Sequence, residues 1–225
     1  AGASLLASGT VNLATGATLD LSAGAGTQVF GTLIGNGTVN LGANTLTIGD
    51  ASNGTFGGSI AGTGGLIKEG TGTETLTGTN TFTGGTTINA GTLAIGAGGS
   101  LAATGAVTLA NAGTAFDISA GGNQSIGSLA GVAGSSVALG GNTLTLGGVG
   151  NTTFDGTIGG TGALIKDGAG VQTLGGANTF SGGVTLNAGG LVVGNNAALG
   201  TGALNVAGNG SLDANAAVTL ANNVA

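Results

Sequence analysis

The chain has 225 residues, of which 54 are Gly and only 4% are charged, and its net charge is −6. The absence of His and Cys excludes zinc clusters and Cys or Ser–His nucleophiles. The shortage of Lys and Arg excludes the basic surface that nucleic acid requires. Because no apolar run approaches the ~18 residues of a membrane-spanning helix, we expect no membrane insertion by this segment.

Short apolar runs separated by Gly, Ala, Asn and Ser fill the first part of the chain. Pairs such as Val11 and Leu13 alternate with a period of two, which places apolar side chains on one face of a strand. Gly recurs too often for a helix of ordinary length. The strands predicted over residues 1–63 are Leu5–Ala7, Thr10–Leu13, Thr18–Leu21, Gln28–Leu33, Thr38–Leu41, Thr45–Ile48 and Gly54–Ile60.

The same pattern continues to the last residue without a linker or a charge block. Apolar residues make up 40% of the chain and its mean hydropathy is +0.48, values that disfavour disorder. We therefore predict one continuous elongated domain over residues 1–225. The strands predicted over residues 64–98 are Leu66–Lys68, Glu74–Thr77, Thr81–Thr83, Thr86–Asn89 and Thr92–Ile95.

A long internal duplication organises the chain. Residues 44–97 and 142–195 align at an offset of 98 without a gap, with 32 identities in 54 positions. A duplication of this length indicates a repeat architecture. Because the sequence begins and stops within the pattern, we expect it to be a fragment of a longer repeat array.

The spacing of equivalent residues favours a parallel β-helix over a sandwich or barrel. Leu46 and Leu66 are 20 residues apart, and Ile67 and Ile88 are 21 apart, which suits one coil of the helix. With coils stacked about 4.8 Å apart, we predict an all-β, single-stranded solenoid of about ten coils, about 50 Å long. The side chains predicted to point inward are Leu76, Ile88, Leu93, Ile95, Leu174, Leu186, Leu191 and Val193.

Phe, Gly and Asn have distinct predicted places in such a coil. Phe30, Phe56 and Phe82 lie 26 residues apart, and we interpret the Phe residues as corner fillers near the interior. Gly and Asn adopt the left-handed conformation that sharp corners require. Asn side chains can also form hydrogen-bonded ladders. The candidates for such ladders are Asn80 with Asn178 and Asn89 with Asn187.

One motif occurs in both copies, running Lys-x-Gly-x-Gly-x-x-x-Leu-x-Gly-x-Asn-x-aromatic-x-Gly-Gly and ending in Gly-x-Leu. Its positions in the first copy are Lys68, Gly70, Gly72, Leu76, Gly78, Asn80, Phe82, Gly84, Gly85, Gly91 and Leu93. Its positions in the second copy are Lys166, Gly168, Gly170, Leu174, Gly176, Asn178, Phe180, Gly182, Gly183, Gly189 and Leu191. Over about 30 residues each, these segments resemble the passenger-associated transport repeat of autotransporter proteins.

The resemblance carries expectations about fold and location. It implies a right-handed β-helix that is the exported passenger of a Gram-negative bacterium. It implies a location that is secreted or on the extracellular side of the outer membrane. It also implies a translocating β-barrel elsewhere in the full chain.

Few residues could carry chemistry. A pair of carboxylates roughly 5–9 Å apart could hydrolyse a glycoside, and the candidates are Asp50, Asp155, Asp167, Glu69 and Glu74. We interpret them as solvated charges, and we interpret the recurring Lys68 and Lys166 as lateral surface charges. The single Asp at matching points of each repeat (Asp20, Asp117, Asp213) cannot supply the oxygen ligands that Ca²⁺ prefers.

These residue types predict no catalytic, cofactor or metal site. Without His, no side chain has an ordinary pKa between about pH 5 and 8. We therefore expect stability to be nearly independent of pH from about pH 6 to 9.

The favoured function is a surface-exposed structural module without catalysis, the stalk or cell-contact surface of an autotransporter-like adhesin. One alternative is a repeat subunit of a self-assembled extracellular fibre or surface layer. A carbohydrate-active β-helix is less favoured because the chain has no Trp or Tyr to stack on a sugar. The partners we expect are another copy of the chain or the surface of a host or neighbouring cell.

Overall fold

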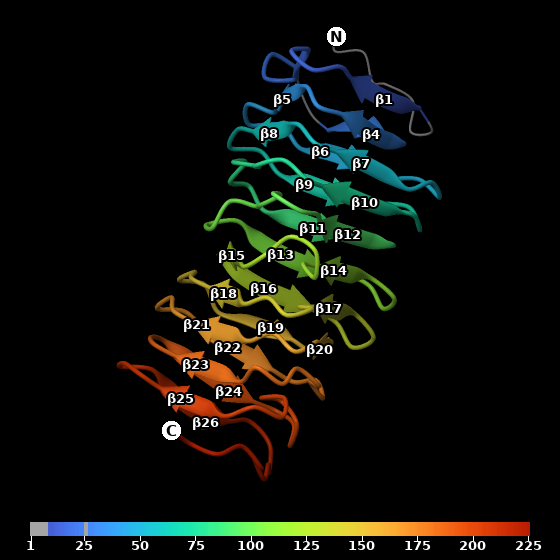
Figure 1. The fold of residues 1–225 in the computed structure, drawn as a ribbon. Coiled ribbons are helices and arrows are strands. Elements are labelled where there is room, and N and C mark those ends of the chain that lie inside the picture. Colours follow the sequence, from blue (N-terminus) through green and yellow to red (C-terminus); the bar gives the residue numbers. More distant parts are fainter. Residues whose placement is uncertain (1–8, 25–26) are drawn as a thin grey trace.

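Short parallel strands stacked along one axis make up the fold in the computed structural model, which describes residues 9–24 and 27–225. Figure 1 shows the coils following one another along a rod, with the chain advancing steadily from one end to the other. No helix occurs in the described residues. The prediction of an all-β parallel solenoid of about ten coils is confirmed, and its right-handed sense stays a prediction. The predicted strand Leu5–Ala7 lies outside the described residues.

The strands lie on three faces. An eight-stranded sheet forms one face, from β1 (Thr10–Leu13), β4 (Thr32–Gly35), β7 (Gly54–Phe56), β10 (Thr73–Leu76), β12 (Thr92–Ile95), β14 (Ala115–Asp117), β17 (Ser136–Ala138) and β20 (Thr157–Gly159). A ten-stranded sheet forms another, from β3 (Gln28–Phe30), β6 (Leu46–Ile48), β9 (Leu66–Lys68), β11 (Thr86–Ile88), β13 (Ala106–Leu109), β16 (Ser128–Gly131), β19 (Thr152–Phe154), β22 (Val171–Leu174), β24 (Gly190–Val193) and β26 (Ser211–Ala214).

The third face holds two shorter sheets. One consists of β2 (Thr18–Asp20), β5 (Thr38–Asn40) and β8 (Ser59–Ala61). The other consists of β15 (Gln124–Ile126), β18 (Leu144–Leu146), β21 (Leu164–Lys166), β23 (Val184–Leu186) and β25 (Leu204–Val206). Between them the coils are joined by an isolated bridge from Thr79 to Ser100 and by backbone hydrogen bonds, such as that from Thr81 N–H to the carbonyl of Ile60 at 2.8 Å.

The register of the ten-stranded sheet gives the length of each coil. Leu46 pairs with Leu66, and Leu66 pairs with Thr86, so these two coils have 20 residues each. Gly131 pairs with Phe154, so that coil has 23. A coil can therefore gain or lose a few residues at its corners while its strands stay in register, because loops tolerate insertions better than paired strands do.

The core is a single apolar column inside the coils. The eight side chains predicted to point inward are at most 1% exposed, which confirms that prediction. All six Phe side chains are buried as well, at most 2% exposed. The ring of Phe154 occupies the space that a Cβ on Gly131 would need, 2.7 Å from that position. The small residue and the large one are therefore complementary across neighbouring coils.

Three predicted strands differ from the structure by more than one residue at an end. Gln28–Leu33 and Gly54–Ile60 are each divided into two strands, because a corner turns the chain at Gly31 and at Gly57–Gly58. Thr81–Thr83 is not a strand. At this place the Asn80 side chain replaces a backbone carbonyl as the hydrogen-bond acceptor between strands. Its Oδ1 accepts from the backbone N–H of Ile60 at 3.0 Å.

The two motif copies lie on different faces of the rod. Lys68 ends β9 in the ten-stranded sheet, whereas Lys166 ends β21 on the third face. The offset of 98 residues explains this difference. Four coils beyond β9 the chain reaches β19, and two further strands, β20 and β21, complete the offset. The repeat thus spans about four and two-thirds coils, and the second motif is turned by one face.

We predict that replacing Phe82 or Phe180 by Ala lowers the free energy of unfolding by roughly 3–5 kcal/mol, the usual range for a buried aromatic ring. Because strand pairing joins each coil only to its neighbours, hydrogen-exchange protection should fall mainly in the adjacent coils. Val149→Ala is the control, because the Val149 side chain is 83% exposed. Exchange that rises uniformly along the rod would contradict the prediction.

Candidate functional site

The repeated lysines lie inside the rod. Lys68 is 1% exposed and Lys166 is 3% exposed. Each is the third residue of a strand whose first residue, Leu66 or Leu164, also points inward. Their interpretation as lateral surface charges is therefore wrong. The period of two that buries Leu66 and Leu164 buries the lysines as well.

Each lysine amino group binds the backbone of the corner that follows it. Lys68 Nζ donates to the carbonyl oxygens of Glu69 at 2.5 Å, Gly70 at 2.9 Å and Ala90 at 3.3 Å. The first two carbonyls belong to its own coil and the third to the next coil. Lys166 Nζ donates to the carbonyls of Gly168 and Ala188 in the equivalent places. The lysine therefore joins two successive corners of the rod.

Burial is the main electrostatic influence on these amino groups. It lowers the pKa of Lys68 below the ordinary value for lysine, while the charges of Glu74, Glu69 and Asp50 act in the opposite direction. Burial also lowers the pKa of Lys166, where Asp167 is the one opposing charge. The carbonyl cage supplies the hydrogen bonds that a buried amino group requires.

The motif glycines lie where successive corners pass over one another. Gly70 has φ +67°, and a Cβ there would lie 2.2 Å from the carbonyl oxygen of Asp50. Gly91 has φ +64°, and its Cβ would lie 2.5 Å from the carbonyl oxygen of Gly72. Side chains are excluded in the same way, by backbone atoms of neighbouring coils, at Gly72, Gly84, Gly168, Gly170, Gly182, Gly183 and Gly189. Gly85, at φ +86°, requires glycine for its conformation.

The motif asparagines link three coils. Asn80 Nδ2 donates to the carbonyls of Gly78 at 2.9 Å and Ser100 at 3.0 Å, while its Oδ1 accepts from Ile60 in the coil before. Asn178 Oδ1 accepts from the backbone of Ile158 at 2.7 Å, and its Nδ2 donates to Ala198 at 2.6 Å. Both asparagines are at most 2% exposed. They bind backbone groups and not one another, so the predicted Asn80–Asn178 ladder is wrong.

The remaining motif positions belong to the apolar core. They are all at most 2% exposed and comprise Leu76, Phe82, Leu93, Leu174, Phe180 and Leu191. The motif as a whole therefore consists of core side chains, close backbone crossings and two polar side chains per copy that satisfy buried backbone groups. Nothing in it presents a reactive group to solvent.

Glu74 is the exception among the carboxylates, and its interpretation as a solvated charge is wrong. It is 2% exposed, and its Oε1 atom has no hydrogen-bond partner. Burial raises its pKa to about 8, and the backbone of Leu33 and the charge of Lys68 oppose that shift only in part. The raised pKa predicts that stability changes with pH between about pH 6 and 9, contrary to the expectation from residue types alone, because a raised pKa couples folding to proton binding.

Three of the other candidate carboxylates accept hydrogen bonds from their own or the next coil. Asp50 accepts from the backbone N–H of Ser52 at 2.6 Å, and this bond lowers its pKa. Glu69 and Asp167 accept from Asn89 and Asn187 of the next coil, at 2.6 Å and 3.2 Å. Among residues 9–24 and 27–225, no group of three or more Asp or Glu could hold a metal ion.

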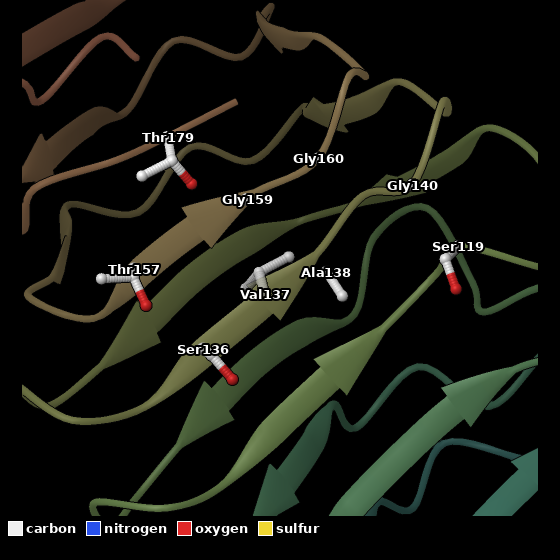
Figure 2. A pocket seen from close by; sticks show the side chains of 9 residues that line it. All are labelled: Ser119, Ser136, Val137, Ala138, Gly140, Thr157, Gly159, Gly160 and Thr179. Atoms are coloured by element: carbon white, nitrogen blue, oxygen red, sulfur yellow. The ribbon is translucent and has the colours of Figure 1, made fainter. Parts of the chain in front are cut away.

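A shallow hollow of about 400 Å³ lies on the eight-stranded sheet over β17 and β20 (Figure 2). The hollow is lined by the hydroxyl-bearing residues Ser119, Ser136, Thr157 and Thr179 and by Gly159 and Gly160. None of its lining residues is titratable or aromatic. The hollow therefore offers neither an acid–base pair nor a stacking platform for a sugar. Within the described residues, no helix is long and apolar enough to cross a membrane.

Comparison with known proteins agrees with this geometry. A model of the family described as "Passenger-associated-transport-repeat" matches the chain twice, at residues 66–95 and 164–193. Both segments are similar to the passenger-associated transport repeat, and together they cover 60 of the 225 residues. Each match begins at the strand that ends in the buried lysine, β9 or β21, and extends through the following coil. Two such repeats in a parallel solenoid are consistent with an autotransporter passenger domain. No curated protein and no solved structure shows significant similarity to the chain.

We predict that Lys68→Met and Lys166→Met each lower the free energy of unfolding by about 1–3 kcal/mol. Methionine keeps an apolar stem of similar length but leaves the corner carbonyls buried without a donor. The corresponding measurement is denaturant unfolding, with hydrogen exchange of Asn89 and Asn187, whose N–H groups bond the lysine carbonyls at 2.8 Å. Asp155→Asn, at an exposed position, is the control. Variants as stable as the parent would show that the lysine cage contributes nothing.

Proposed function

We propose that the chain is a surface-exposed structural module of an autotransporter-like protein, acting as a stalk or cell-contact surface without catalysis. The observation that carries this proposal is the presence of two transport repeats in one parallel solenoid whose polar motif side chains all bind backbone groups. The repeat residues are thus committed to holding successive coils together. A rigid rod made in this way suits the presentation of a surface at a distance from a cell.

The rotation of the second motif supports a structural role for the repeat. A binding stripe would require equivalent residues on the same side of the rod. Here β9 and β21 lie on different faces, so the two lysine corners point in different directions around the axis. A motif that makes the same contacts on two faces of the rod stabilises the coils and does not form a common binding surface.

A subunit of a self-assembled fibre or surface layer is the second candidate, and one observation favours it. The middle residues of the strands in the ten-stranded sheet form an uncharged outer column through most of the rod. Pairings between coils align Val29, Thr47, Ile67, Thr87, Thr108 and Ala130, and then Thr153, Thr173 and Val192. Apart from the buried Thr47, these side chains are partly or fully exposed, so the column could lie against another copy. Sedimentation that depends on concentration would favour the fibre.

The experiment that tests the proposal places an epitope tag after Val149, in an exposed loop, within the full-length protein in a Gram-negative cell. We expect antibody to label intact cells and external protease to remove the label. The same tag on a periplasmic protein is the control and should be labelled only after permeabilisation. Labelling of the passenger that also needs permeabilisation would overturn the surface assignment.

A deletion tests the stalk. Removing residues 66–163 joins Gly65 to Leu164, so that one repeat replaces the other at an equivalent position. We predict a folded rod shorter by about 22 Å, from about four and two-thirds coils at about 4.8 Å each. Small-angle scattering measures the length, and tag labelling checks that display is retained. Removal of 90 residues, from 66 to 155, is the mismatched control and should destabilise the rod, because the joined strands then fall on the wrong face.

A further inference from the structure

Glu74 occupies a place in the wall of the rod that its counterpart in the second repeat fills with a neutral side chain. It is the second residue of β10, between β7 and β12. Its side chain curls over Gly54 in the coil before, where Oε2 lies 2.4 Å from the position that a Cβ would take. The absence of a side chain at Gly54 therefore makes room for the carboxyl group.

Gln172, the equivalent residue at the offset of 98, has every polar atom paired. Its Nε2 donates to the carbonyls of Leu129 and Thr173, both at 3.0 Å, and its Oε1 accepts from the Thr152 hydroxyl at 3.0 Å. Thr152 is itself the counterpart of Gly54. The first repeat thus lacks the hydroxyl donor that the second supplies, which fits the unpartnered Oε1 of Glu74.

A protonated carboxyl group resembles the Gln172 amide in having one donor and one acceptor side. An ionised carboxylate has acceptors only, and its burial is costly without enough donors. The neighbouring strands β4, β7 and β12 carry no titratable residue. The charges that face Glu74 are Lys68 at the end of β9 and Asp50 in the loop after β6. Lys68 gives its hydrogen bonds to backbone carbonyls, so it compensates the carboxylate only through space.

We propose that Glu74 makes the first transport repeat an acid-stabilised, alkali-sensitive joint in the rod, while the neutral Gln172 gives the second repeat no such joint. In the folded rod the carboxyl group is held as the neutral acid. When it ionises, the wall formed by β7, β10 and β12 loosens, and the coils around the second repeat keep their packing. The rod can then open at one defined place along its length.

The direction of the pH dependence follows from the raised pKa. Burial lifts the pKa of Glu74 from 4.5 to about 8. An acid with a raised pKa in the folded state contributes its full stability below the unfolded value. That contribution to the free energy of unfolding declines as pH rises from 4.5 and is lost above about 8. The joint is therefore firm in mildly acidic surroundings and weak in alkaline ones.

Hydrogen exchange in both repeats of one molecule tests the proposal. With intrinsic rates corrected, we expect the protection of Thr73–Leu76 to fall by up to about tenfold per pH unit between about pH 5 and 8. The equivalent strand, Val171–Leu174, should keep its protection over the same range. Equal behaviour of the two strands, whether both change or neither does, would overturn the proposal.

Reciprocal substitutions provide the matched controls. Glu74→Gln should abolish the pH dependence at β10 and raise protection there at about pH 8. Gln172→Glu should transfer a pH dependence to β22. If Gln172→Glu does not fold, the ¹³C resonance of the Glu74 carboxyl group in the parent protein decides the question. A titration midpoint near the ordinary value for glutamic acid, or a Glu74→Gln variant that keeps the parent's pH dependence, would overturn the proposal.

Discussion

Hydrogen bonding between successive coils is the constraint on which the whole structure depends. Every strand pairs only with its equivalents in the coils before and after it, and the corners continue this pattern, as when Glu69 N–H bonds the carbonyl of Ile48 and Asn89 N–H bonds that of Lys68. A single coil has no partner within itself. Stability is therefore a property of neighbouring pairs, and each corner must pass close to the next without losing its hydrogen bonds.

The unusual composition follows from that constraint. Corners that stack backbone on backbone leave no space for Cβ atoms, so glycine is needed at crossings such as Gly70 over Asp50. Carbonyls that turn inward at those crossings need donors, which Lys68 and Asn80 provide. Proline would remove ladder donors, and the chain contains none. The few charged residues comprise carboxylates that are partly or fully exposed, such as Asp155, and a buried set of Lys68, Lys166 and Glu74, of which the two lysines bind backbone carbonyls.

The sequence predicted the solenoid, its coil length and its core because these depend on periodicity, which a single chain displays directly. The burial of Lys68 and Glu74 was not predicted, because their charge indicated an exposed position whereas the period of two along their strands indicated an inward one. Glu74 and Leu76 are two residues apart, as are Leu66 and Lys68, so the alternation already placed both charges inside. The carbonyl cage and the unpartnered Oε1 could not be predicted, since they depend on how corners of different coils approach one another in space.

The polar side chains of the motif bind the backbone, whereas other side chains of the repeats face outward. This division indicates where a partner could contact the rod. Motif residues that bind neighbouring coils are the same in both repeats, because the same crossings recur on each face. The outward positions of the two repeats are free to differ, and they do: Thr71 and Thr73 correspond to Ala169 and Val171. A partner that contacts the rod would meet these variable side chains and not the buried side chains of the motif. Two repeats with one internal architecture therefore present two different surfaces, turned by one face, and a longer array would vary its contacts around the axis without changing its core.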